Sequence, residues 1–292
     1  MAFSAVAVRG VRANNRTSHF DAIAMCLIAF ALDVHPLYRL ILAGNRDEFH
    51  VRPTTPLARW SDAPDVLAGC DLEAGGTWMG VSERGRACVV TNVREPLRPG
   101  DFASRGLLAL DYLQATQSAD KSANMLLAKA DSYRPFNLLL FDQHDARFVS
   151  NRPQPDARVV MPGIHGLSNA TLDTPWPKTR GLKQALRNWI SKPQADFEHE
   201  NFVDLFAVLA DETLAADVEL PNTGVGIEIE RRLSPAFIRG AYYGTRACSV
   251  IAITHSGAAV FIERRFGAEA AFEGETILRF NYRIDRRESS RR

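Results

Sequence analysis

The sequence has few cysteines and no long apolar run. Its four cysteines, at positions 26, 70, 88 and 248, form no C-x-x-C pair and no Cys/His spacing of the kind that binds zinc. No structural metal site is therefore expected. Scattered thiols fit a reducing compartment, so we expect a cytoplasmic protein. No apolar run approaches the roughly 20 residues that a membrane-spanning helix needs, and we expect no transmembrane segment.

An excess of charge of one sign is also missing. The 292 residues include 35 Lys and Arg against 34 Asp and Glu, which leaves a net charge of +1. Nucleic-acid-binding proteins usually carry clustered Lys and Arg in excess, so no nucleic-acid partner is expected. Hydrophobic residues make up 46% of the chain, enough for a sizeable core. Because the interior has no repeat and no low-complexity linker, we expect one domain over residues 25–285.

The two ends of the chain differ from the rest. Residues 1–24 contain three arginines and no acidic residue before Asp21. They fit either a transit-like segment that is cleaved or a false start, in which translation begins at Met25 and the extension is not native. We favour the false start. The basic tail at 286–292 is expected to be disordered.

Antiparallel hairpins dominate the expected elements. Apolar runs broken by turn residues predict hairpins over 26–44, 75–94, 136–150 and 246–266, and a further strand within 274–284. Helical spacing of apolar residues predicts helices over 105–115, 123–133, 176–190 and 201–211. Because the helices come in groups between hairpins, the pattern favours an α+β fold with helices packed outside antiparallel sheets.

Cys26 stands at the start of the first apolar run, directly after Met25. A cysteine there is usually a small apolar core residue. If Met25 is the initiator and is removed, Cys26 becomes the first residue, with its thiol beside a free α-amine. That amine has an ordinary pKa of about 7.7–8.0, so it can act as a general base near neutrality. A nucleophile and a base then share one residue, as in an N-terminal nucleophile. If residues 1–24 stay attached, the nitrogen is an amide and no base.

Other polar residues stand where predicted strands begin or end. The string NRDE at 45–48 includes Arg46, which could favour a thiolate, and Asp47, which could hold an ammonium group. A solvated charged turn is the alternative. Asn92 and Asn169 could donate to an oxyanion, a contribution worth about 3–4 kcal/mol of barrier, or could be turn and cap residues. Arg246 begins a late strand and by itself indicates nothing further.

A series of short motifs resembles a known family. In chain order they are MCLIAF, NRDE, RPT, GGTWMG, TNVRE, SRG, FNLLL, LSNATLDTPWPKT, PNTG and YGTR. Together they resemble the NRDE family, also called the transport and Golgi organisation 2 family, over about residues 25–285. Members of that family typically begin at the Met-Cys pair, which supports a false start here. A transit peptide cut just before Cys26 would also free the amine.

The resemblance implies a fold similar to the N-terminal nucleophile hydrolases, a four-layer αββα sandwich of two antiparallel sheets between helical layers. The layout also resembles the choloylglycine hydrolase and penicillin V acylase group. On that analogy Cys26 is the nucleophile, Asp47 contacts its α-amine and Arg46 lies nearby. On the same analogy, Asn92 and Asn169 form the oxyanion hole or orient the amine. Arg246 helps to polarise the site.

Two functions fit this resemblance. The first is a cysteine hydrolase that acts on a linear, non-peptide, small-molecule amide and requires no cofactor. The alternative is a haem-binding or haem-trafficking protein that uses the same pocket without hydrolysis.

Overall fold

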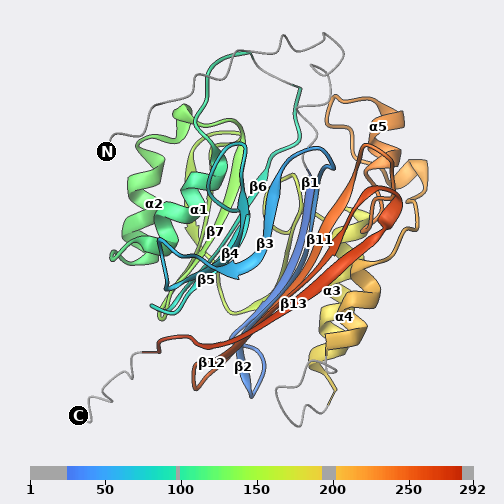
Figure 1. Cartoon of the computed structure of the whole chain (residues 1–292). Coiled ribbons are helices and arrows are strands. Elements are labelled where there is room, and N and C mark those ends of the chain that lie inside the picture. The colour runs from blue at the N-terminus through green and yellow to red at the C-terminus, as the bar shows by residue number, and fades with distance from the viewer. Residues whose placement is uncertain (1–24, 97–98, 193–201, 285–292) are drawn as a thin grey trace, which may run out of the picture.

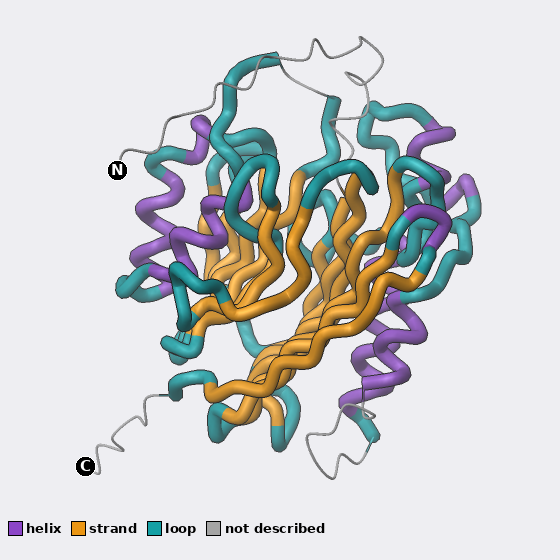
Figure 2. The backbone as a smooth tube through the Cα atoms, in the orientation of Figure 1, coloured by secondary structure: helices purple, strands orange, loops and turns teal. Residues whose placement is uncertain are grey.

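The computed structural model describes residues 25–96, 99–192 and 202–284. Two β-sheets face each other at the centre, and helices cover the outer face of each (Figure 1). Figure 2 shows the strands as two inner layers flanked by helices. The predicted four-layer αββα architecture is confirmed. The expected boundaries at 1–24 and 286–292 lie outside the described residues.

The first sheet has six strands, and every neighbouring pair is antiparallel. Their order is β10 (Gly163–Leu167), β1 (Met25–Leu32), β2 (Tyr38–Phe49), β11 (Tyr243–Thr254), β12 (Ala258–Phe266) and β13 (Phe272–Asn281). The hairpin of β1 and β2 is the one predicted at 26–44. In this sheet, β2 extends to Phe49, so the NRDE string forms the end of a strand.

The second sheet has seven strands in chain order, again all antiparallel. They are β3 (Thr54–Arg59), β4 (Val66–Asp71), β5 (Met79–Ser82), β6 (Arg86–Asn92), β7 (Phe136–Phe141), β8 (Ala146–Ser150) and β9 (Asp156–Val159). The predicted hairpins at 75–94 and 136–150 are present here as β5–β6 and β7–β8.

Apolar side chains alternate along the central strands and create two kinds of core. On β1, Ile28 and Phe30 face the second sheet and pack with Met79 and Phe141. Leu27 and Ala29, at the intervening positions, face the helices. This period of two is what a strand buried on both faces requires. Consequently every polar residue on the inner strands points into one of two defined compartments.

The helices fall into two groups, as predicted. Helices α1 (Arg105–Gln114) and α2 (Ala119–Leu127) pack on the second sheet, and η1 (Ala130–Ser132) follows them. Helices α3 (Pro177–Ile190) and α4 (Val203–Leu209) pack on the first sheet. A short α5 (Ile227–Arg232) and two 3₁₀ turns, η3 (Asp217–Glu219) and η4 (Ala268–Ala270), complete the described elements. None of the described helices is long and apolar enough to span a bilayer.

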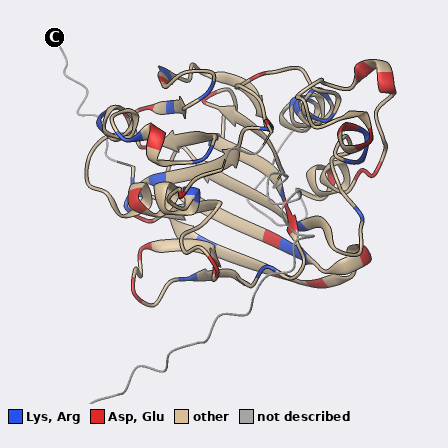
Figure 3. Cartoon of the chain, turned by 90° about the horizontal axis from the view of Figure 1, so that it is seen from above, with Lys and Arg blue, Asp and Glu red and all other residues tan. Residues whose placement is uncertain are grey.

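Charged residues of both signs are spread through the molecule. Figure 3 shows basic and acidic residues interspersed along the same elements, in keeping with the net charge of +1. The charges that matter for the site are therefore the few that are buried.

Candidate active site

Cys26 faces a cavity between the two sheets. It lies at the start of β1 and is the cross-strand partner of Arg46 on β2. Side chains of such partners lie on the same face of a sheet, and two residues further along β1 Ile28 faces the inter-sheet core. Both Cys26 and Arg46 line a cavity of about 350 Å³. Strand register thus brings the predicted nucleophile and Arg46 together.

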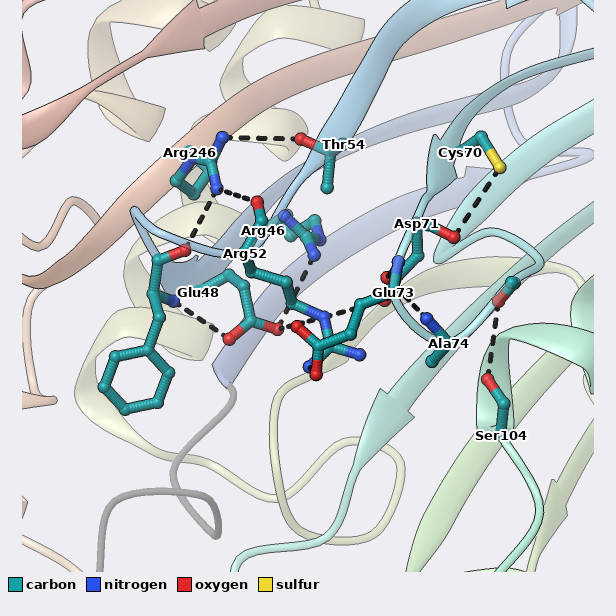
Figure 4. A network of polar contacts seen from close by, with 12 residues as sticks. Arg46, Glu48, Arg52, Thr54, Cys70, Asp71, Glu73, Ala74, Ser104 and Arg246 are labelled. Carbon is teal, nitrogen blue, oxygen red and sulfur yellow. Dashed lines mark hydrogen bonds and ion pairs between the residues drawn. The ribbon is translucent and has the colours of Figure 1, made fainter. Parts of the chain in front are cut away.

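Arg46 is buried on the cavity wall without a strong partner. Its guanidinium carbon lies 4.3 Å from the centre of the Trp78 ring, and Nη2 lies 3.5 Å from Glu48 Oε2. No hydrogen bond joins its guanidinium to another described residue. Figure 4 shows Glu48 between Arg46 and Arg52, with Arg52 continuing to Asp71 at 2.9 Å. This chain of charges fixes the cavity rim and leaves Arg46 able to bind a ligand.

The Cys26 thiol is strongly disfavoured as a thiolate. Burial between the sheets raises its pKa to about 12, and the nearby Asp47 carboxylate adds to the rise. Arg46 and Arg105 act in the opposite direction but do not overcome burial. A cysteine in this state is a poor nucleophile until a base takes its proton. Nucleophilic chemistry at Cys26 would therefore need a base close to the thiol.

Asp47 lies on the opposite side of β2 from Arg46, towards the helices. Its backbone is opposite Met25 on β1. Oδ1 accepts a hydrogen bond of 2.6 Å from Thr245 Oγ1, while the fully buried Oδ2 has no partner among the described residues. Burial raises the pKa of Asp47 to about 6, although the cation of Lys178 lowers it in part. A buried carboxylate oxygen without a partner is costly, so this position is suited to a donor that is not among these side chains.

Three further charged residues share the compartment of Asp47. Lys178 is the second residue of α3, and its ammonium donates to the carbonyl of Leu233 at 2.9 Å. Burial lowers the pKa of Lys178 to about 8, against the opposing effect of Asp47. Arg94 follows β6, pairs with Glu230 of α5 and lies over the Trp176 ring at 4.5 Å. The compartment therefore holds two carboxylates and two cations.

Asn92 and Asn169 are brought together across the two sheets. Asn169 Nδ2 donates to Asn92 Oδ1 at 2.7 Å, and the backbone carbonyl of Asn169 accepts from Arg94 N at 2.7 Å. Ser168 joins this pair to Cys26 because its Oγ donates to the Cys26 carbonyl at 2.9 Å. Since Asn92 Oδ1 is occupied, its Nδ2 is the free end, and Asn92 lines the cavity. The pair offers one amide donor near Cys26.

Arg246 does not join this cavity. Its Nη1 donates to the carbonyls of Phe49 at 3.0 Å and Arg52 at 2.9 Å, which fixes the turn between β2 and β3. It lines a second cavity of about 280 Å³, which shares Arg46 and Trp78 with the first. Arg246 therefore lies behind the wall that Arg46 and Trp78 form.

Sequence reasoning missed Lys178, although a signal was present. Positions 178, 182 and 186 are spaced by four residues and lie on one face of α3, where Leu182 and Leu186 are buried. A lysine that continues such an apolar stripe is expected to point inward. Glu230 gave no comparable signal because its helix has six residues. Within the part of the chain that the structure describes, no cluster of three or more His, Cys, Asp or Glu is arranged to hold a metal ion.

Comparisons with known proteins identify relatives over most of the chain. A family model described as Transport and Golgi organisation 2 (TANGO2) matches residues 25–268. The mouse Transport and Golgi organization 2 homolog is 32% identical over 259 residues, covering 82% of this chain and 92% of the mouse protein. The human homolog is 33% identical over the same shares of each chain. The Drosophila melanogaster protein is 28% identical over 275 residues, covering 82% of this chain and 91% of its own.

Solved structures give weaker likenesses. An N-acylethanolamine-hydrolyzing acid amidase ortholog from Caenorhabditis elegans has a TM-score of 0.45 and 9% identity, over 77% of this chain and 92% of the other. A mutant conjugated bile acid hydrolase from Clostridium perfringens has the same score and identity, over 89% and 92%. At this level neither likeness bears on the chemistry of the site. The family match and the mammalian relatives are decisive: the chain belongs to the Transport and Golgi organisation 2 family.

Proposed function

We propose that the chain is an N-terminal nucleophile hydrolase that cleaves a linear, non-peptide amide when Cys26 carries a free α-amine. The observation that carries the proposal is the unpartnered, buried Oδ2 of Asp47 beside the start of β1. The nitrogen of Cys26 lies at that strand end, and a free amine there could donate to this oxygen. Cys26 itself faces a cavity large enough for a small substrate.

The state of the thiol also supports a self-contained base. Because burial raises the pKa of Cys26 to about 12, almost none of the thiol is ionised at neutral pH, so its attack on a carbonyl needs a base that takes the proton. An α-amine on the same residue is within reach of the thiol proton by construction. The proposed chemistry therefore depends on the removal of everything before Cys26.

Asn92 is the proposed oxyanion donor, and Asn169 positions it. Asn169 Nδ2 donates to the backbone carbonyl and to Oδ1 of Asn92, which leaves Asn92 Nδ2 free on the cavity side. A preorganised donor of this kind contributes roughly 3–4 kcal/mol to lowering a barrier. The two asparagines thus have different parts in the reaction.

The proposed steps balance without a cofactor. Cys26 Sγ bonds to the amide carbonyl carbon while its proton passes to the α-amine, and Asn92 donates to the oxyanion. The carbon–nitrogen bond then breaks, and the α-ammonium returns the proton to the leaving amine. Water, deprotonated by the same α-amine, attacks the thioester. The carboxylic acid leaves and the thiol is restored.

The test compares three chains expressed from Met25, each checked for methionine removal by its intact mass. The first is unchanged, the second carries Cys26→Ala, and the third has one alanine inserted between Met25 and Cys26. The inserted chain keeps the thiol but moves the free amine to another residue. With a panel of linear acyl aminocoumarin amides, we expect turnover only in the first chain. Equal turnover in the inserted chain would overturn the proposal.

Haem binding is the second candidate, and one observation favours it. Arg105 and Arg134 line the Cys26 cavity, and neither has a carboxylate partner among the described residues. They could pair with the propionates, and Cys26 is the one thiol among the described residues that line the cavity. Iron binds the thiolate, however, and burial opposes thiolate formation here. A titration with haemin decides: a saturable Soret band that Cys26→Ala abolishes supports haem, and its absence favours the hydrolase.

A further inference from the structure

Asp47 and Lys178 are two neighbouring buried charges whose hydrogen-bonding capacity is not filled. Asp47 Oδ2 has no partner among the described residues, and Lys178 uses one of its three hydrogens, on the Leu233 carbonyl. The two groups influence each other electrostatically, but they do not meet as an ion pair within 4 Å. Charges buried in this way are usually fully hydrogen-bonded. A third group is needed between or beside them.

The α-amine of Cys26 is the group that would fill this position under the proposed function, on which this inference rests. An amine beside a lone buried carboxylate would be held as an ammonium ion, because an opposite charge favours the charged form. An ammonium ion cannot accept the thiol proton. The site therefore needs a second cation that already satisfies the charge of Asp47.

Lys178 meets that requirement. We propose that Lys178 is a positioning residue that neutralises Asp47, so that the freed amine of Cys26 binds Asp47 as an uncharged hydrogen-bond donor and remains a base. One carboxylate cannot stabilise two neighbouring ammonium ions equally, and like charges disfavour each other. The charge balance at Asp47 is thus tied to the proton transfer that the proposed reaction requires.

The other charged residues around Asp47 do not neutralise it in place of Lys178. Arg94 is balanced by Glu230, with which it forms a buried ion pair. Arg46 lies on the opposite face of β2, and its effect on the pKa of Asp47 is weaker than that of Lys178. In the described part of the chain, the remaining titratable groups that interact electrostatically with Asp47 or Lys178 are Cys26 on β1, and Tyr243 and Cys248 on β11. Among the described residues, Lys178 is the cation that acts most strongly on Asp47.

The test measures the amine directly and needs no substrate. The chain is expressed from Met25, which retains all the described helices and strands, and is labelled with [¹⁵N]cysteine. The pH midpoint of the α-amine is read from its nitrogen chemical shift. We expect the midpoint at or below its ordinary value of about 7.7–8.0, and about one unit or more higher in Lys178→Met. Lys183→Met is the matched control, since Lys183 is on the same helix and pairs with Asp173.

A second variant keeps the test decisive if Lys178→Met does not fold. In Asp47→Asn the carboxylate is lost while Lys178 remains, so the midpoint should fall below that of the unchanged chain. An unchanged midpoint in Lys178→Met, or a raised one in Asp47→Asn, overturns the role of Lys178. Turnover plays no part in this readout. The hydrolase proposal can therefore fail on its own, through absent turnover, while the midpoints still shift as expected.

Discussion

The buried ion pair of Arg94 and Glu230 offers a sharp test of the structure. Arg94 is 5% exposed and Glu230 is 2% exposed. Glu230 Oε2 accepts from Arg94, while Oε1 accepts from Thr223 N at 2.9 Å and Thr223 Oγ1 at 2.6 Å. Glu230→Gln keeps the shape of the side chain but removes its charge. It also places an amide donor at one of the two positions that accept from Arg94 and Thr223, and the guanidinium already has two unpartnered nitrogens, Nε and Nη2.

The expected cost follows from leaving a buried cation without its counter-charge. Removing one partner of a buried ion pair costs about 3–5 kcal/mol. Asp47 also acts on Arg94 and compensates in part, so the expected loss is about 3 kcal/mol, at the lower end of that range. For a chain of this size each kcal/mol moves the melting temperature by roughly 2–4 °C. Glu230→Gln should therefore lower Tm by about 6–12 °C.

Thermal unfolding followed by circular dichroism measures this change, with Glu228→Gln as the matched control. Glu228 lies on the same helix, and its pair with Arg231 is exposed, so its loss should cost about 0–1 kcal/mol. Replacing both Arg94 and Glu230 by methionine removes the uncompensated charge and should recover most of the lost stability. A Tm for Glu230→Gln within about 2 °C of the unchanged protein would refute the reasoning. A double variant no better than the single one would do the same.

Three further predictions concern the thiol, the backbone and the buried carboxylate. In the chain that retains Met25, the pKa of Cys26 at about 12 predicts haloacetamide alkylation at pH 8 at least about tenfold slower than that of free cysteine. Peptide mass spectrometry measures the rate, and equal rates would contradict this. A Cβ on Gly76, at φ +77, would lie 2.2 Å from the carbonyl carbon of Gly106, so Gly76→Ala should cost more than about 2 kcal/mol. Gly181→Ala, with nothing within 4 Å, should instead stabilise α3 by about 0.5–1 kcal/mol, and the reverse order of Tm values would count against both. Folding raises the pKa of Asp47 to about 6, so protonation of Asp47 favours the folded state. This contribution to the free energy of unfolding is complete below about pH 4 and is lost as the pH rises through 6. Urea unfolding at pH 4.5 and 6.5 should show this loss, and Asp47→Asn should lack it.

The sequence predicts most of the buried inner strands and one edge strand, β13, but it misses the buried inner strand β4. The runs behind β1, β2, β7 and β11 are buried almost throughout, so their pattern is visible. Strand β3 contains Pro56 and is mostly exposed, and β9 is exposed along most of its length. Both are edge strands, where proline and polar residues are tolerated. These two edge strands carry too little apolar pattern to stand out from loops.

The sequence indicated several residues of the candidate site but not how their side chains are arranged. Cys26, Arg46 and Asp47 could be chosen because they lie at strand ends, and strand pairing does bring them to one region. Arg246 lies between Thr245 and Ala247, at the register shift between β11 and β2, and its side chain turns to the β2–β3 corner. A local bulge of this kind depends on the pairing of two strands about 200 residues apart. No local pattern contains that information.

The alternation of β2 gives the NRDE string two separate tasks. Asn45 and Asp47 face the helices, where Asn45 Nδ2 donates to the Leu209 and Ala236 carbonyls. The side chains of Arg46 and Glu48 face the cavity with Cys26, and Asp47 between them also contributes to the cavity lining. Because successive side chains of a strand point to opposite faces, four consecutive residues build both compartments. Cys26 lies where the compartments meet, with its thiol in the cavity and its backbone nitrogen at the strand end beside Asp47. A one-residue slip of β2 against β1 would exchange the two sets. The strand register, more than any single charge, therefore determines that the thiol of Cys26 faces the cavity while its proposed base, the α-amine, lies on the side of Asp47.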